Sequence, residues 1–161
     1  MITPMHPDGS VNYTEIDRIL EDQIAAHTDA IIACGTTGEA STLDDQEHLD
    51  VIGHVVKRVD GRIPVIAGTG SNNTAHAIMM SKEAADLGAD GLLVVTPYYN
   101  KTSQAGLVAS YTAVADATDL PVIMYNVPSR TGVNIAPETA KTLSAHPKIN
   151  AIKEASGNIS Q

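Results

Sequence analysis

The chain has 161 residues, of which 43% are hydrophobic, and a formal net charge of -9. This length suffices for one domain with a core, and the absence of phenylalanine and tryptophan makes that core aliphatic. The negative charge argues against nucleic acid as a partner, because phosphates require a basic surface. No apolar run approaches the ~18 residues of a membrane span, and the single cysteine favours a reducing, cytoplasmic setting.

Apolar strands and helical stretches alternate from Ser10 onward with a period of about 30 residues. Asp44 and Glu47 have the spacing of a capping box at the start of one of these helices. Near-continuous apolar strands that alternate with helices predict a parallel sheet buried on both faces. The predicted strands are 30–34, 64–69, 91–96, 121–127 and 150–155, and the predicted helices are 13–27, 44–59, 74–87, 107–117 and 137–145.

Polar clusters follow nearly every predicted strand, which helps to choose between a barrel and an open sheet. Functional residues that come from the ends of several strands are typical of barrel active sites, whereas an open doubly wound sheet binds its ligand at one switch point. Gly68-x-Gly70 lacks the third glycine of a dinucleotide fingerprint. The expected fold class is therefore α/β, of the (β/α)8 TIM-barrel type.

This barrel is expected to be truncated to about six βα units. Residues 2–5 read as the end of a first strand, and the sequence stops after the sixth. A closed eight-stranded barrel typically takes ~250 residues. We therefore expect residues 1–161 to form a single partial barrel domain that lacks the last two strands, as a piece of a longer chain.

A lysine near the end of the last predicted strand is the first candidate for chemistry. Residues 150–157 read as a short buried strand in which Ala151, Lys153 and Ala155 share one face. Lysines are rarely buried without a partner or a function, although an ammonium can also reach solvent from a strand end. A free lysine amine has a pKa near ~10.4, and burial lowers it, which supplies a neutral nucleophile.

Three further loops carry candidate residues. The N–H groups and threonine hydroxyls of residues 35–39 could hold a carboxylate, although a plain glycine-rich loop has the same composition. Tyr98 and Tyr99 suit either catalysis or an interface, and Arg130 suits either carboxylate binding or a surface ion pair. The six histidines are scattered without metal-ligand spacing, so no metal site is expected.

Five motifs in this order resemble those of the dihydrodipicolinate synthase / N-acetylneuraminate lyase family, which are pyruvate-dependent aldolases on (β/α)8 barrels. The resemblance covers essentially the whole chain, whereas the C-terminal helical region of the family is absent. The motifs are GTTGE at 35–39, GTGSNNT at 68–74, VTPYYNK at 95–101, YNVPSRTG at 125–132 and IKEASGN at 152–158.

The resemblance implies a class I aldolase-type lyase. Such an enzyme would condense pyruvate with L-aspartate 4-semialdehyde through a lysine Schiff base to give 4-hydroxy-tetrahydrodipicolinate, in lysine and diaminopimelate biosynthesis. By the same resemblance Lys153 is the Schiff-base lysine and Tyr125 stands beside it, while Thr36 and Tyr99 complete a hydroxyl relay. The alternatives are another aldolase of the family, similar to N-acetylneuraminate lyase or to a keto-deoxy sugar acid aldolase, or an inactive truncated fragment.

The resemblance also implies the substrate contacts and the partners. Thr37 would bind the carboxylate of pyruvate, and Arg130 would hold that of aspartate semialdehyde. No cofactor is expected beyond the covalent lysine–pyruvate imine, and neither nucleic acid nor a membrane is an expected partner. The family forms dimer-based homo-oligomers, commonly tetramers, in which the residue at Tyr99 reaches the neighbouring subunit's site. Asp45 and His76 depart from family members that lysine inhibits, which carry a histidine and a glutamate there.

Overall fold

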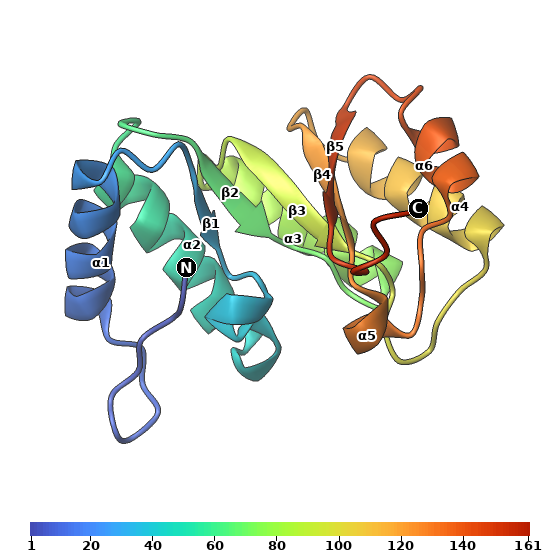
Figure 1. The fold of residues 1–161 in the computed structure, drawn as a ribbon. Helices are drawn as coiled ribbons and strands as arrows, with labels where there is room; N and C mark the ends of the chain where they lie inside the picture. The colour runs from blue at the N-terminus through green and yellow to red at the C-terminus, as the bar shows by residue number, and fades with distance from the viewer.

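Five parallel strands form one sheet in which each strand pairs with the next along the chain. The structure is a computed structural model that describes residues 1–161 (Figure 1). The five strands predicted from residue 30 onward are confirmed, with ends that differ by at most one residue. They are β1 Ile31–Ala33, β2 Val65–Gly68, β3 Gly91–Val95, β4 Val122–Asn126 and β5 Ile149–Glu154.

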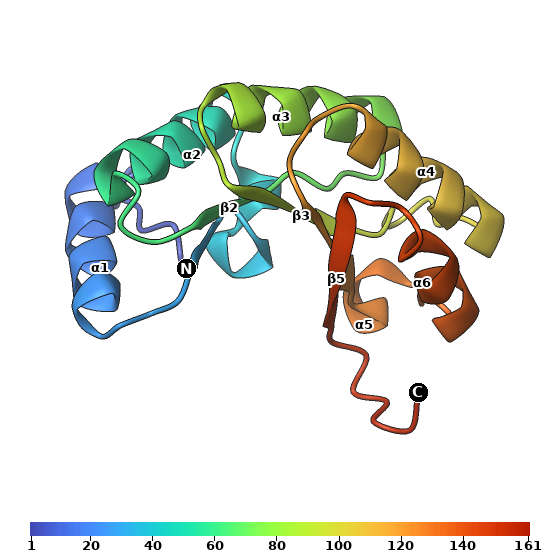
Figure 2. The ribbon, with the colours of Figure 1, turned by 90° about the horizontal axis from the view of Figure 1, so that it is seen from above.

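The longer helices alternate with the strands and lie along the convex outer side of the curved sheet, while its concave side is open (Figure 2). This arrangement confirms the (β/α)-barrel type, present here as an arc rather than a closed ring. β1 pairs only with β2 and β5 only with β4, so the arc has two free edges. The helices are α1 Tyr13–Ala25, α2 Asp45–Val59, α3 Thr74–Asp86, α4 Gln104–Asp116, α5 Pro128–Thr131 and α6 Pro137–Leu143.

Polar side chains cap the helices that connect the strands. The predicted capping box of α2 is confirmed, because Asp44 accepts from the backbone N–H of Glu47 at 2.9 Å and Glu47 accepts from that of Asp44 at 3.3 Å. Asn73 likewise accepts from the N–H groups of the first turn of α3. These caps satisfy N–H groups that have no partner inside the helix, and they fix where each helix leaves its loop.

The main core lies between the sheet and the outer helices. It contains 26 buried residues and is aliphatic apart from Tyr111, as the composition predicts. A second, smaller cluster of Leu93, Tyr125 and Val127 faces the concave side. The inner face of the sheet is therefore also apolar, but no layer of this chain covers it.

Residues 2–5 do not form the end of a strand in the sheet, so the sheet has five strands rather than six. Met5 makes one isolated antiparallel bridge with Val11, and Asn12 donates its N–H to the carbonyl of Pro4. Pro4 has no N–H group to contribute to a ladder. This short segment folds back on itself, while Thr3 donates its hydroxyl to the carbonyl of Gly38.

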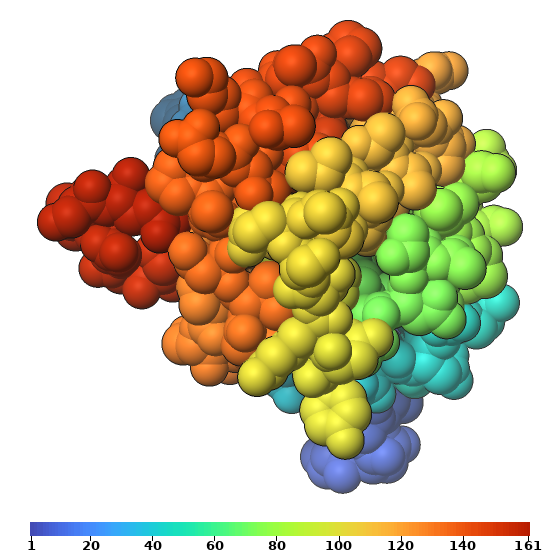
Figure 3. Space-filling view, turned by 90° about the vertical axis from the view of Figure 1, so that its right-hand side faces the viewer, coloured from blue at the N-terminus to red at the C-terminus, as the bar shows by residue number.

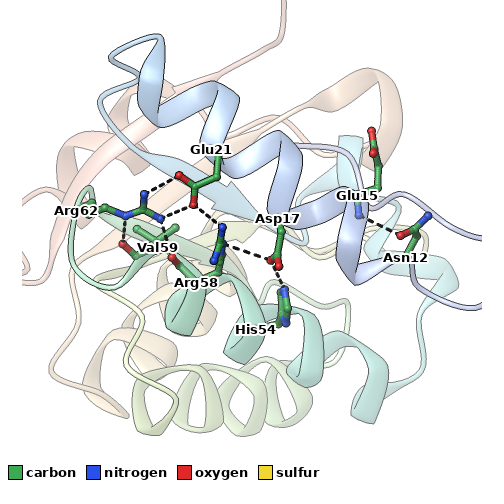
Figure 4. Close-up of polar contacts among 8 residues, drawn as sticks. All are labelled: Asn12, Glu15, Asp17, Glu21, His54, Arg58, Val59 and Arg62. Carbon is green, nitrogen blue, oxygen red and sulfur yellow. Dashed lines mark hydrogen bonds and ion pairs between the residues drawn. The ribbon is translucent and has the colours of Figure 1, made fainter.

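Ion pairs join α1 to α2 on the outer side of the arc (Figure 4). Asp17 contacts His54 at 2.7 Å, and Glu21 contacts Arg58 at 2.9 Å and Arg62 at 2.8 Å. All of these side chains are partly exposed, so each pair contributes little to stability. They set how α1 lies on α2, and none of them lines the cavity described below.

The residues after β5 form no helix or strand and project from the body of the molecule (Figure 3). The tail is nonetheless attached to the fold at its end, because the side chain of Gln161 donates to the carbonyl of Ile135 and accepts from Asn134. It therefore folds back beside the loop that precedes α6.

Candidate active site

A cavity of about 420 Å³ opens at the C-terminal ends of the strands on the concave side. Residues that follow β1, β2, β3 and β4 all line it, as expected for a barrel-type site. Three of the predicted site residues are among them, namely Thr36, Tyr125 and Arg130. The other three, Thr37, Tyr99 and Lys153, do not line it.

The loop after β1 forms a short 3₁₀ turn, Thr36–Gly38. Cys34 and Glu39 on either side of this turn adopt positive φ angles of 52° and 54°. This backbone is unusual for residues with a Cβ, so it shapes the loop tightly. Thr36 and Thr37 are both exposed, but only Thr36 faces the cavity.

Tyr125 and Lys153 lie opposite each other on β4 and β5. The Nζ atom of Lys153 stands 4.3 Å from the centre of the Tyr125 ring, within the range of a cation–π contact. Tyr125 is only 6% exposed, so its ring forms a fixed wall at the end of β4. The structure thus brings these two predicted residues together at the edge of the cavity.

The prediction that β5 is a buried strand is wrong for this chain. Only Ile149 of β5 is buried, and Lys153 is exposed. The reason is topological, because β5 is an edge strand with β4 on one side and no strand on the other. Its apolar sequence suits a central strand, but nothing in residues 1–161 covers it.

Arg130 lies on the single-turn helix α5, which begins at Pro128 and ends at Thr131. Gly132, which follows the helix, adopts the left-handed conformation. The guanidinium of Arg130 lines the cavity and forms no ion pair. Within residues 1–161 Arg130 therefore does not form the surface ion pair that was its alternative role. A free guanidinium at a cavity wall is available for a carboxylate.

Tyr99 does not line this cavity and is 90% exposed. Its φ angle is 68°, and that of Lys101 is 57°, so the loop after β3 is held in an uncommon conformation. The side chain of Asn100 ties the loop to the carbonyl of Asn72. Tyr98, its neighbour in sequence, lines the cavity instead.

Two titratable groups at the cavity wall are shifted by burial. Burial raises the pKa of Cys34 to about 12, so its thiol stays protonated at neutral pH. Burial also lowers the pKa of His48, although a hydrogen bond to the carbonyl of Gly68 at 2.8 Å opposes this shift. Nearby, Asp45 and His76 contact each other at 2.9 Å. This pair occupies the two positions that depart from the lysine-inhibited pattern.

Polar residues that the motifs did not identify as part of the site lie behind the strand ends. Asn126 is 0% exposed and bonds to Glu154 and Asn134, and Gln104 bonds to the loop before α6. The sequence could have indicated this contact, because an asparagine directly follows Tyr125 and a glutamate directly follows Lys153.

No three histidine, cysteine, aspartate or glutamate side chains gather into a metal-binding group. No helix has the length and apolar character needed to cross a membrane.

Residues 1–161 match the Dihydrodipicolinate synthetase family over their whole length. The chain belongs to this family. It is 58% identical over all of its 161 residues to the 4-hydroxy-tetrahydrodipicolinate synthase of Caldicellulosiruptor saccharolyticus, of which it covers 55%. The chain thus spans about half the length of the curated relatives it matches.

Solved structures of the Dihydrodipicolinate synthetase family share the same arc. The chloride-inhibited dihydrodipicolinate synthase from Acinetobacter baumannii, complexed with pyruvate, is 49% identical and superposes with a TM-score of 0.97 over 99% of this chain and 55% of that one. A dihydrodipicolinate synthase variant described as monomeric is 41% identical, with a TM-score of 0.97 over 100% of this chain and 54% of that one. The fold of residues 1–161 is therefore that of the corresponding part of these relatives.

Proposed function

We propose that this chain carries the reacting residues of a 4-hydroxy-tetrahydrodipicolinate synthase, which condenses pyruvate with aspartate semialdehyde through an imine on Lys153. The observation that carries this proposal is the pairing of Lys153 with Tyr125 at 4.3 Å beside a cavity that Thr36 and Arg130 line. A lysine that packs over a tyrosine ring, beside a cavity that a threonine and a free arginine line, suits carbonyl chemistry on a carboxylate substrate. The motifs and the family membership support the same reaction.

The amine of Lys153 attacks the ketone carbon of pyruvate, and loss of water gives the imine. Loss of a methyl proton from the imine then gives the enamine, whose carbon adds to the aldehyde carbon of aspartate semialdehyde. The amino group of that substrate closes the ring on the imine carbon and releases the lysine. Each step moves a proton, and we assign its relay to the hydroxyls of Tyr125 and Thr36, which are two of the residues that line the cavity.

The carboxylates of the two substrates need separate donors in a protein with a net charge of -9. Thr37, next to Thr36 in the 3₁₀ turn, is the proposed donor for pyruvate. Arg130 is the proposed donor for aspartate semialdehyde, because its planar fork can bind both oxygens of a carboxylate. Neither role requires a metal ion or an organic cofactor.

Tyr99 enters this proposal through a second copy of the chain. Its side chain is 90% exposed and does not line the cavity of its own chain. We therefore assign it to the hydroxyl relay of a neighbouring copy. The free edges of β1 and β5 and the apolar inner face also favour association. Light scattering should find residues 1–161 in oligomers, and a monodisperse monomer would contradict this assignment.

Borohydride reduction in the presence of pyruvate tests the proposed imine. It should place one stable adduct on Lys153, identified by peptide mass spectrometry, and Lys153→Arg should abolish it. Lys82→Arg on α3 is the matched control, because Lys82 is an exposed lysine outside the cavity. An adduct on another lysine, or equal labelling of all lysines, would overturn the assignment of Lys153.

A further inference from the structure

The pairing of β5 with β4 is irregular at its start. Val122 pairs with Ile149, but Ile123 pairs with Ala151, so Asn150 has no partner on β4. Beyond this irregularity Tyr125 pairs with Lys153. A shift of one residue in a strand moves every side chain to the opposite face. The position of Lys153 beside Tyr125 therefore depends on what fixes the register after the irregularity.

Asn126 fixes that register from the end of β4. Its Nδ2 donates to Oε2 of Glu154 at 2.8 Å and to Oδ1 of Asn134 at 2.9 Å, so both of its amide protons are used. Its Oδ1 accepts from the N–H of Ile135 at 3.0 Å, and its backbone carbonyl accepts from that of Ala155 at 2.8 Å. Asn126 is 0% exposed, so a slipped register would leave its polar atoms buried without partners.

Glu154 completes the contact from the β5 side. Its second carboxylate oxygen accepts from the N–H of Ser156 at 2.6 Å. Desolvation raises the pKa of Glu154, but the hydrogen bonds from Asn126 and Ser156 outweigh it and hold the pKa below its ordinary value. The carboxylate is thus charged at neutral pH, and a hydrogen bond to a charged acceptor is among the stronger kinds.

The loop before α6 supports Asn126 from behind. Gln104, at the start of α4, donates to the carbonyl of Asn134 at 2.8 Å and accepts from the N–H of Ala136 at 3.0 Å. Asn134 and Ile135 in this loop both bond to the side-chain amide of Asn126. The loop is in turn bonded to α4 through Gln104, so the amide is held from the side opposite β5 as well. The side chain of Asn126 therefore has a fixed position, and β5 is hydrogen-bonded to it.

We propose that Asn126 is a positioning residue that, through its side-chain hydrogen bond to Glu154, sets the register of β5 so that Lys153 lies beside Tyr125. Neighbouring residues on a strand point to opposite faces. Asn126 and Glu154 therefore hold the strand from the outer side, while Tyr125 and Lys153 meet on the inner side. This inference rests on the proposed function of Lys153, but the register itself can be measured without any reaction.

Engineered disulfides measure the register directly. In a Cys34→Ala background, Tyr125→Cys with Lys153→Cys places two thiols at paired positions, about 4.8 Å apart between the strands and within the span of a disulfide. This pair should cross-link readily when Asn126 is present and about tenfold less when Asn126→Leu is added. Cross-linking of Tyr125→Cys with Ile152→Cys should rise in its place, because a ladder without the irregularity would pair Tyr125 with Ile152 and because Glu154 is retained. Equal cross-linking of the first pair with and without Asn126 would overturn the proposal.

Exchange of the donor and the acceptor tests the same contact through the chemistry of Lys153. Asn126→Asp sets two carboxylates against each other, whereas Asn126→Asp with Glu154→Gln restores one donor and one acceptor. Trapping of pyruvate at Lys153 by borohydride should fall about tenfold or more in the single variant and rise again by about threefold or more in the double variant. Recovery is partial because Asn126→Asp also removes the hydrogen bond to Oδ1 of Asn134, which Glu154→Gln does not restore. Failure of the double variant to recover, while the single variant loses trapping, would also overturn the proposal.

A matched control separates positioning from a general loss of stability. Val122→Ala removes buried volume at the other end of β4 and leaves the bonds of Asn126 in place. It should lower the melting temperature and leave trapping at Lys153 unchanged at temperatures where the protein is folded. If the wild-type chain itself gives no adduct at Lys153, the proposed function fails, and the disulfide measurement still decides the register.

Discussion

Substitution of Gly68 by alanine should destabilise the fold sharply. Gly68 ends β2, and a Cβ placed there would lie 2.2 Å from the carbonyl oxygen of Cys34 and 2.8 Å from its carbonyl carbon. The first of these distances is about 1 Å shorter than an ordinary contact between carbon and oxygen. Both atoms belong to backbone, so β1 and β2 would have to separate at the mouth of the cavity. No side-chain rotation could relieve the clash.

The expected cost is at the upper end of what overpacking causes, about 3 kcal/mol. For a chain of this size, that loss corresponds to a fall in melting temperature of about 6–12 °C. Gly53→Ala is the matched control. Gly53 lies inside helix α2, and a Cβ there would meet only the flexible side chain of Leu87, at 3.2 Å. Alanine favours a helix over glycine by ~1 kcal/mol, so this variant should melt at the wild-type temperature or slightly above it.

Thermal unfolding followed by circular dichroism compares the two variants, and urea unfolding gives their free energies. Gly68→Ala should unfold at a lower temperature and at a lower urea concentration than both the wild type and Gly53→Ala. If Gly68→Ala and Gly53→Ala have the same melting temperature, the close approach of β2 to Cys34 does not limit the packing and the reasoning is refuted.

Three further predictions follow from the cavity wall. Arg130→Ala should lower kcat/KM for aspartate semialdehyde by about one to two orders of magnitude while trapping of pyruvate on Lys153 is unchanged; equal loss of both would mean a structural role. Because burial raises the pKa of Cys34 to about 12, iodoacetamide should alkylate the native thiol far more slowly than the unfolded one, and equal rates would contradict its burial. Burial in the fold lowers the pKa of His48, so the unfolded chain binds a proton there more readily than the folded one. The free energy of unfolding should therefore be highest above about pH 6.5 and decrease as the pH falls below that value. His48→Gln, which can still donate to Gly68, should flatten that decline in urea unfolding, and an unchanged pH profile would show that His48 is not its cause.

Much of the fold follows from local sequence. The strands from β1 to β4 are largely apolar, and a proline directly precedes β2 and β4, so their positions could be predicted to within one residue. The capping box of Asp44 and Glu47 likewise marks the start of α2. Residues 2–5 are short and partly apolar, a composition that also suits the end of a strand. A local pattern cannot show that Met5 pairs with Val11 instead.

The candidate site could be predicted only in part. Side chains at strand ends identify Thr36, Tyr125 and Arg130, since parallel strands bring their C-terminal ends together. The exposure of Lys153 could not be foreseen, because a strand's sequence does not state whether a neighbour covers it. The contact of Asn126 with Glu154 joins residues 28 positions apart, and the irregular ladder must be known before the two can be aligned.

The exposed lysine on an edge strand has a consequence for how reactivity would arise. A strand that paired with β5 would satisfy its free backbone groups and at the same time exclude water from the side of Lys153. Exclusion of water favours the neutral form of a lysine amine, which is the nucleophilic form, at neutral pH. Closure of the ring would then also raise the reactivity of the amine, so a chain in which a further strand covers β5 should trap pyruvate at Lys153 faster than residues 1–161 alone.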